Sequence, residues 1–107
     1  MLIEIVTFDL PETMTRDEML QTAYSVADKW RKVPELVRKS FYYDGDNHTG
    51  GAVYQWKDPD AAEQWHDEAW RASIRRTFGS DPRVRRFDMP LIVDNEMGKT
   101  EEYPAVM

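Results

Sequence analysis

The pattern of apolar and polar positions changes from a strand-like to a helical period near the start of the chain. Residues 2–8 are apolar on both alternating faces apart from two positions, one of which is Glu4. This pattern is typical of a strand covered on both sides. Thr15 and Glu18 then have the spacing of a capping box, which marks the start of a helix. The apolar positions that follow at helical spacing are Met19, Ala23, Val26, Ala27 and Trp30. We expect this helix to end near Pro34.

The rest of the pattern predicts three more strands and one more helix. Residues 36–43 and 52–57 are β-rich, and the residues between them are turn formers such as Gly, Asp and Asn. A helix is expected over 59–78, because an Asp-Pro pair opens it and a glycine follows it. Residues 81–94 supply the fourth strand, in which Pro90 marks a bulge or a change of partner.

The order β-α-β-β-α-β predicts an α+β, ferredoxin-like fold, with a four-stranded antiparallel sheet and both helices on one face. The length of 107 residues suits a single domain. We expect this domain to span 1–95 and an acidic tail to occupy 96–107.

The second and third strands carry more aromatic residues than two short helices can cover. Some of them are therefore expected on the uncovered face of the sheet, where a large apolar patch needs a partner or a ligand. A second subunit packed sheet to sheet would bury this face and leave a cavity between the subunits. The aromatic residues concerned are Phe41, Tyr42, Tyr43, Tyr54 and Trp56.

Composition and charge exclude several classes of function. With 14 basic and 20 acidic residues the net charge is −6, which argues against binding to nucleic acid or to an anionic membrane surface. The absence of cysteine excludes disulfides, cysteine-based zinc sites and thiol catalysis. No run approaches the roughly 20 apolar residues of a membrane span. The first residues have the pattern of a strand rather than of a signal peptide, so we expect a cytoplasmic protein.

One of the two histidines, His66, lies between two tryptophans in the segment QWHDEAW. On a continuous helix over 59–78, the central buried stripe would be Ala62, Trp65, Ala69 and Ala72. One shoulder of that stripe would carry His66, Trp70, Ser73 and Thr77. His66 could then be a proton shuttle at the mouth of a cavity, since imidazole titrates near neutral pH. The alternative is that it packs on Trp70 and hydrogen-bonds at the surface.

Glu4 is the most informative carboxylate, because it interrupts an apolar strand that the fold makes central. If it is buried, it either acts as an acid or base with a raised pKa, or pairs with Lys39 or an arginine. The alternative is an exposed residue near the end of the strand.

A metal or haem site is not favoured by the sequence. Three consecutive helical residues, as in the "HDE" of 66–68, point about 100° apart and cannot share one metal ion. The other histidine, His48, lies in a turn and is expected to be solvated. We therefore predict no metal and no cofactor.

Residues on the third strand are candidates for ligand binding. Tyr54 and Trp56 share one face of that strand, and Gln55 lies on the other. An amide buried in a central strand needs a partner, a water or a ligand, because leaving it unpaired costs roughly 1–3 kcal/mol.

Three segments of the chain resemble one known superfamily. VPELVRK (33–39), GAVYQWKD (51–58) with the following AAEQW, and FGSDPRVRRFDMPLIVDN (78–95) are similar to the dimeric α+β-barrel proteins. The greatest similarity is to their small monooxygenase-like members, which are related to the antibiotic-biosynthesis monooxygenases. Glu35 stands where the family pattern has glycine, and Gln55 where it has an aliphatic residue.

The resemblance implies a homodimer in which two sheets form a barrel whose lumen holds the substrate. It also implies cofactor-independent oxygenation of a small hydrophobic molecule, aromatic or polyketide-like. On this hypothesis Glu4 or His66 is the catalytic base, while Gln55, Tyr54, Trp56 and Trp70 bind the substrate. Two alternatives remain open, which are a cyclase or isomerase using acid–base chemistry and a small-molecule-binding dimer without turnover.

Overall fold

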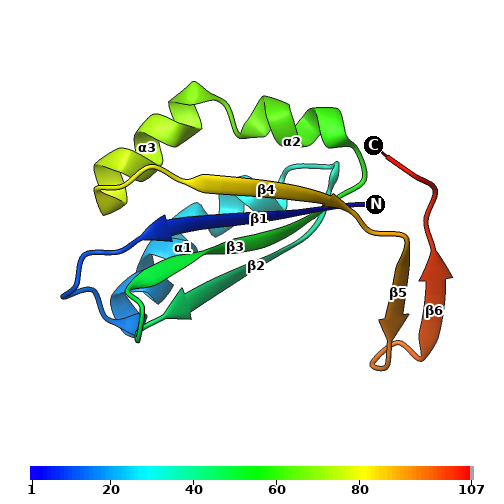
Figure 1. Ribbon diagram of the computed structural model, residues 1–107, viewed down its shortest axis with the longest axis horizontal. Coiled ribbons are helices and arrows are strands. Elements are labelled where there is room, and N and C mark those ends of the chain that lie inside the picture. The colour runs from blue at the N-terminus through cyan, green and yellow to red at the C-terminus, as the bar shows by residue number, and fades with distance from the viewer. Residues whose placement is uncertain (107) are drawn as a thin grey trace.

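The computed structural model describes residues 1–106 and contains a four-stranded antiparallel sheet, a separate two-stranded hairpin and three helices (Figure 1). The strands of the main sheet are β1 (Leu2–Asp9), β2 (Leu36–Asp44), β3 (Thr49–Trp56) and β4 (Arg83–Asp88). The helices are α1 (Arg16–Arg31), α2 (Pro59–Trp65) and α3 (Glu68–Phe78). The predicted α+β class and the antiparallel four-stranded sheet are confirmed.

The strand order of the main sheet is β2-β3-β1-β4, and every adjacent pair is antiparallel. This order is compatible with a ferredoxin-like fold. β1 and β3 are the two central strands, as the apolar pattern of residues 2–8 predicted. The register pairs Glu4 with Tyr54 of β3 on one side and with Arg86 of β4 on the other.

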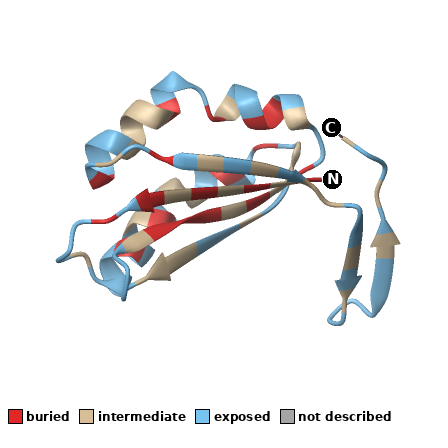
Figure 2. Ribbon diagram, in the orientation of Figure 1, coloured by how far each residue is buried: buried red, intermediate tan, exposed pale blue. Residues whose placement is uncertain are grey.

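The core lies between the helices and one face of the sheet (Figure 2). Alternate residues of β1 and β3 point into it, and they are buried: Leu2, Glu4, Val6, Phe8, Ala52, Tyr54 and Trp56. The sheet face that packs against the helices thus carries large aromatic side chains and one carboxylate. The opposite face carries the intermediate positions Ile3, Ile5, Val53 and Gln55.

Most of the aromatic residues face the helices rather than the open side of the sheet. Phe41 lines a cavity beneath α1, and the Tyr43 hydroxyl donates to the carbonyl oxygen of Met14. Tyr42 lies on the open side, where its hydroxyl donates to Thr7 Oγ1. The expectation that some aromatic residues lie on the open face is therefore met by Tyr42.

The first helix begins and ends as its sequence predicts. The hydroxyl of Thr15 accepts from the amide of Glu18, and the Glu18 carboxylate accepts from the amide of Thr15. Met19, Ala23 and Trp30 are the buried residues of its inner face. The capping box therefore fixes where α1 starts, and its apolar stripe fixes which face it buries.

The expected single helix over 59–78 is instead two helices, because the chain breaks at His66 and Asp67. Asp67 has extended backbone angles, and its side chain caps α3 by accepting from the amide of Trp70. The break changes the helical phase, so the predicted buried stripe is wrong beyond Trp65, which still packs against the core. Ala69 is exposed and Trp65 is half-buried, whereas His66 and Trp70 are buried.

The expected acidic tail is also partly wrong. β5 (Leu91–Asp94) and β6 (Lys99–Glu102) pair as an antiparallel hairpin that projects from the main sheet (Figure 1). The turn uses an aspartate cap, in which Asp94 Oδ1 accepts from the amide of Met97, and a glycine of positive φ at Gly98. The division at residue 95 therefore falls inside one hairpin. Met107 lies outside the described residues.

Candidate functional site

Glu4 is fully buried and is contacted by three side chains from distant parts of the chain. The indole Nε1 of Trp56 donates to its Oε1 at 2.9 Å, and the Nε of Arg86 donates to its Oε2 at 2.7 Å. His66 Nδ1 lies 2.8 Å from the same Oε1. The carboxylate therefore has partners on both oxygens, as a buried charge requires.

His66 occupies the break between α2 and α3, and its ring is packed among aromatic side chains. It stacks on Trp70 with 4.0 Å between ring centroids, and it meets the Tyr54 ring edge-on at 4.6 Å. His66 is 5 % exposed, and its Nε2 has no hydrogen-bond partner among residues 1–106. The histidine is thus neither on the helix shoulder nor at the surface, although the expected packing on Trp70 is present.

The environment of this pair favours an ionised glutamate beside a neutral histidine. Burial alone would raise the pKa of Glu4, but its contacts with His66, Arg86 and Trp56 outweigh burial and lower the pKa below its usual value. Burial lowers the pKa of His66, and the attraction of Glu4 only partly offsets this. A neutral ring whose Nδ1 faces a carboxylate carries its proton on Nδ1, which leaves Nε2 as a free acceptor.

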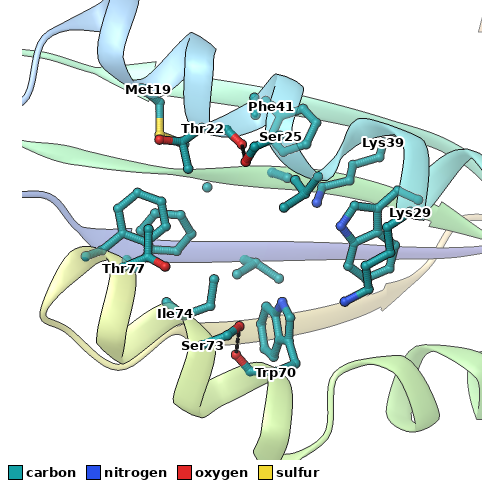
Figure 3. Close-up of a pocket in the computed structure, with 18 of the residues that line it drawn as sticks. Met19, Thr22, Ser25, Lys29, Lys39, Phe41, Trp70, Ser73, Ile74 and Thr77 are labelled. Atoms are coloured by element: carbon teal, nitrogen blue, oxygen red, sulfur yellow. Dashed lines mark hydrogen bonds between the residues drawn. The ribbon is translucent and has the colours of Figure 1, made fainter.

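A cavity of about 210 Å³ lies between α1, α3 and the helix face of the sheet (Figure 3). It is smaller than the ~300–1,000 Å³ typical of drug-sized ligands, so it suits a small molecule. Most of its walls are apolar or aromatic. The large lining side chains are Phe8, Met19, Trp30, Phe41, Tyr54, Trp70, Ile74 and Phe78. This cavity lies within one chain, on the helix side of the sheet, and is distinct from the cavity that we expect between two subunits.

The structure brings most of the predicted site residues together. Tyr54 and Trp70 line the cavity, and His66 contacts both of their rings from behind. Glu4 and Trp56 lie next to His66 but do not line the cavity. The carboxylate and imidazole thus support the cavity wall from behind.

Gln55 lies apart from this group, on the open face of the sheet. Within residues 1–106, its one side-chain hydrogen bond is from Nε2 to the sulfur atom of Met89, at 3.9 Å. The partner that a half-buried amide needs is thus present, but it is a weak one. His48 is exposed in the β2–β3 turn, as expected, and its φ is 50°.

Sequence reasoning missed the residues that make the cavity polar at one end. Lys39 and Lys29 line it, and Lys39 had been considered only as a partner of Glu4. Of the two partners expected for Glu4, Lys39 or an arginine, the structure shows the arginine, which is Arg86. A usable signal was present in β2, since Lys39 alternates with Phe41 and Tyr43 and must share their inward face.

Ser73 and Thr77 also line the cavity, together with Trp70. The sequence had placed these three on one helix shoulder with His66. The prediction that these three residues share one side of a helix is confirmed, because all three lie in α3, after the break.

Comparison of the chain with models of known protein families and with curated proteins finds no match. Within residues 1–106, none of the helices combines the length and the apolar character that crossing a membrane requires. The same residues contain no group of three or more His, Asp or Glu side chains arranged to hold a metal ion.

Proposed function

We propose that the protein is an enzyme that binds a small hydrophobic molecule, aromatic or polyketide-like, in the cavity between its helices and sheet and oxygenates it without a cofactor. The observation that carries this proposal is the wall of the cavity. Tyr54 and Trp70 face the ligand space and are backed by a neutral histidine that a buried glutamate orients.

Cofactor-independent oxygenation needs the substrate as an enolate or phenolate, which can give an electron to O₂. The protein then has to accept a proton, hold the resulting anion and exclude water. Burial raises the pKa of Tyr54 well above its usual value, with the charge of Glu4 adding to the effect. Tyr54 therefore keeps its proton and serves as a hydrogen-bond donor to the substrate oxygen.

A ligand in the cavity meets His66 only through Tyr54 and Trp70. In this proposal Glu4 and His66 are positioning residues that fix these two rings. Nε2 of His66 is a buried nitrogen without a hydrogen-bond partner among residues 1–106, and in this proposal it is also the base that takes up the proton lost by the substrate.

The proposal includes a homodimer in which two sheets pack face to face. The open face of the sheet offers a largely apolar centre, and the residues concerned are Ile3, Ile5, Val53 and the 37 % exposed Phe87. A contiguous apolar surface of this kind favours a protein partner. Gln55 would then face the space between the two sheets.

Oxygen consumption with 1,4-dihydroxynaphthalene tests the oxygenase proposal. The balanced reaction consumes one O₂ and yields 2-hydroxy-1,4-naphthoquinone and water, and the diphenol supplies all four electrons. Uncatalysed oxidation gives instead 1,4-naphthoquinone and hydrogen peroxide, so mass spectrometry of the product after incubation with isotopically labelled O₂ separates the two reactions.

We expect one labelled oxygen atom in the product and a loss of at least tenfold in rate on His66→Asn. The matched control is His48→Asn, because this exposed turn residue with positive φ tolerates asparagine and is remote from the cavity. Product without labelled oxygen, or equal rates for both variants, would contradict the proposal. Substrate rearrangement without O₂ consumption would favour the acid–base cyclase or isomerase.

A further inference from the structure

Among residues 1–106, the only charged side chains that line the cavity are two lysines, and both lie at one end (Figure 3). Lys39 enters from β2 and Lys29 from α1, whereas Met19 and Thr77 line the opposite end. None of the lining residues in the described part of the chain is acidic. In a chain with a net charge of −6, the cavity is therefore a local exception to the charge of the whole molecule.

Lys39 is the more enclosed of the two amines and is surrounded by aromatic rings. Its Nζ lies 4.3 Å from the centroid of the Trp30 ring, 4.2 Å from that of Phe41 and 4.8 Å from that of Tyr54. Among residues 1–106 it takes part in no ion pair and no hydrogen bond. Ring faces stabilise an ammonium only partly, so the amine retains the capacity to bind an anion.

The other polar groups of the cavity are mostly committed to the protein itself. The hydroxyls of Thr22, Ser25 and Ser73 each donate to a carbonyl oxygen of their own helix. They are therefore less available as donors to a ligand. Lys39 and the hydroxyl of Tyr54 remain as the donors that approach the cavity from the sheet.

We propose that Lys39 binds the ionised oxygen of a small aromatic ligand, a carboxylate, phenolate or enolate, in this cavity. The inference rests on the proposed function for the location of the ligand and adds its charge. Charge-assisted hydrogen bonds are strong in a water-poor cavity, where the effective dielectric constant is low. The aromatic rings around Lys39 would then stack against the ligand's own ring.

Binding without turnover separates this inference from the oxygenase proposal. The probes are 2-naphthoate and 2-naphthamide, which have nearly the same shape and differ in charge. Quenching of tryptophan fluorescence reports binding, since Trp30 and Trp70 line the cavity, and isothermal titration calorimetry gives an independent affinity. We expect the wild-type protein to bind naphthoate at least tenfold more tightly than naphthamide at pH 6.5.

Three variants assign the preference to one amine. Lys39→Met should abolish the preference for naphthoate while leaving the affinity for naphthamide within about twofold. Lys39→Arg should retain a preference, because it keeps a cation at the same position. Lys29→Met is the matched control, and it should retain most of the preference, since Lys29 is exposed to solvent. Thermal unfolding of each variant checks that the fold is intact.

Equal affinity of the wild-type protein for the two probes, or no binding of either, would overturn the inference. A preference that survives Lys39→Met or disappears with Lys29→Met would also overturn it. If naphthoate is preferred through Lys39 but dihydroxynaphthalene is not oxygenated, the anion site stands and the oxygenase proposal fails.

Discussion

Glu4 Oε1 and His66 Nδ1 lie 2.8 Å apart in the core, joining the central strand β1 to the break between α2 and α3. Both side chains are buried, and Arg86 and Trp56 complete the contacts of the carboxylate. This relationship couples the stability of the fold to the wall of the cavity, because the His66 ring packs directly on Trp70.

Removal of the Glu4 charge should be strongly destabilising. Glu4→Leu leaves the guanidinium of Arg86 and the indole N–H of Trp56 without their acceptor, and breaking a buried ion pair from one side costs about 3–5 kcal/mol. Urea denaturation measures the free energy of unfolding. The control is Glu68→Leu, since Glu68 pairs with Arg75 at the exposed surface, where an ion pair contributes about 0–1 kcal/mol. Similar losses in the two variants would contradict this prediction.

Acidification should destabilise the protein before most of its carboxylates titrate. The pKa of His66 in the folded state lies below its unfolded value of 6.5. As the pH falls below 6.5, the unfolded chain binds more protons than the folded protein, and the equilibrium shifts toward unfolding. Glu4, whose pKa is also lowered, contributes stability that is lost at still lower pH. The free energy of unfolding should therefore decrease between pH 7 and pH 5, and His66→Phe should flatten this slope. An equally steep slope in His66→Phe would exclude His66 as its source.

Lys39→Met should stabilise the folded protein at neutral pH and below. Burial, with a further contribution from Lys29, lowers the pKa of Lys39 to about 7. The charged groups in its surroundings are Lys29 on α1 and the ionised Glu4 on β1, and the neutral titratable neighbours are His66 and Tyr54. Because the pKa is lower in the folded state, the charged lysine destabilises the folded protein. This destabilisation is complete below pH 7 and decreases as the pH rises toward the unfolded pKa of 10.5.

The increase in midpoint temperature caused by Lys39→Met should thus be largest at pH 6 to 7 and smaller at pH 9. A variant that gains stability but loses anion binding is the trade-off expected of a functional residue. An equal gain at pH 6 and pH 9 would contradict the proposed cause.

Gly51→Ala should destabilise the sheet much more than Gly79→Ala. Both glycines have positive φ, but a Cβ atom at Gly51 would lie 1.8 Å from the carbonyl oxygen of Val6, whereas at Gly79 it meets nothing within 4 Å. For Gly79→Ala we expect roughly 1–2 kcal/mol from the left-handed backbone alone. For Gly51→Ala the two central strands must also separate, so the loss should be larger. Chemical denaturation of both variants gives the comparison.

The proposed sheet-to-sheet dimer predicts an elution mass about twice the 12.6 kDa of the chain. Val53→Asp places a charge at the centre of the open face and should shift the protein to the monomer. Tyr24→Asp is the control, because Tyr24 is an exposed residue of α1, on the helix side. A wild-type protein that elutes as a monomer in light-scattering chromatography would exclude the dimer.

The strands of the main sheet and the first helix were predictable because local patterns determine them, whereas the hairpin of β5 and β6 was not predicted. The apolar residues on both faces of 2–8 identified a central strand, and the capping box gave the start of α1. The break at His66 was not predicted, because the residues before it and the residues after it both have helical periodicity. The sequence pattern alone therefore did not show that they belong to two helices. The signal that could have found it is Asp67, a good N-cap residue directly before Glu68.

The candidate site was only partly predictable, for a different reason. Glu4 and His66 were each singled out by their unusual surroundings in the sequence. That they lie together depends on the tertiary packing of β1 against the segment between α2 and α3, which no local pattern encodes. The position of the cavity on the helix side depends in the same way on how α1 and α3 pack over the sheet.

The contacts of Glu4 also bear on the order of events in folding. One carboxylate joins β1 to β3, to β4 and to the segment between α2 and α3, and its partners lie at positions 56, 66 and 86. Contacts this distant in sequence carry a large loop-closure cost. Water can leave the carboxylate only once all of these segments are in place. We therefore expect the Glu4 cluster to form late in folding, so that substitutions in it mainly raise the rate of unfolding.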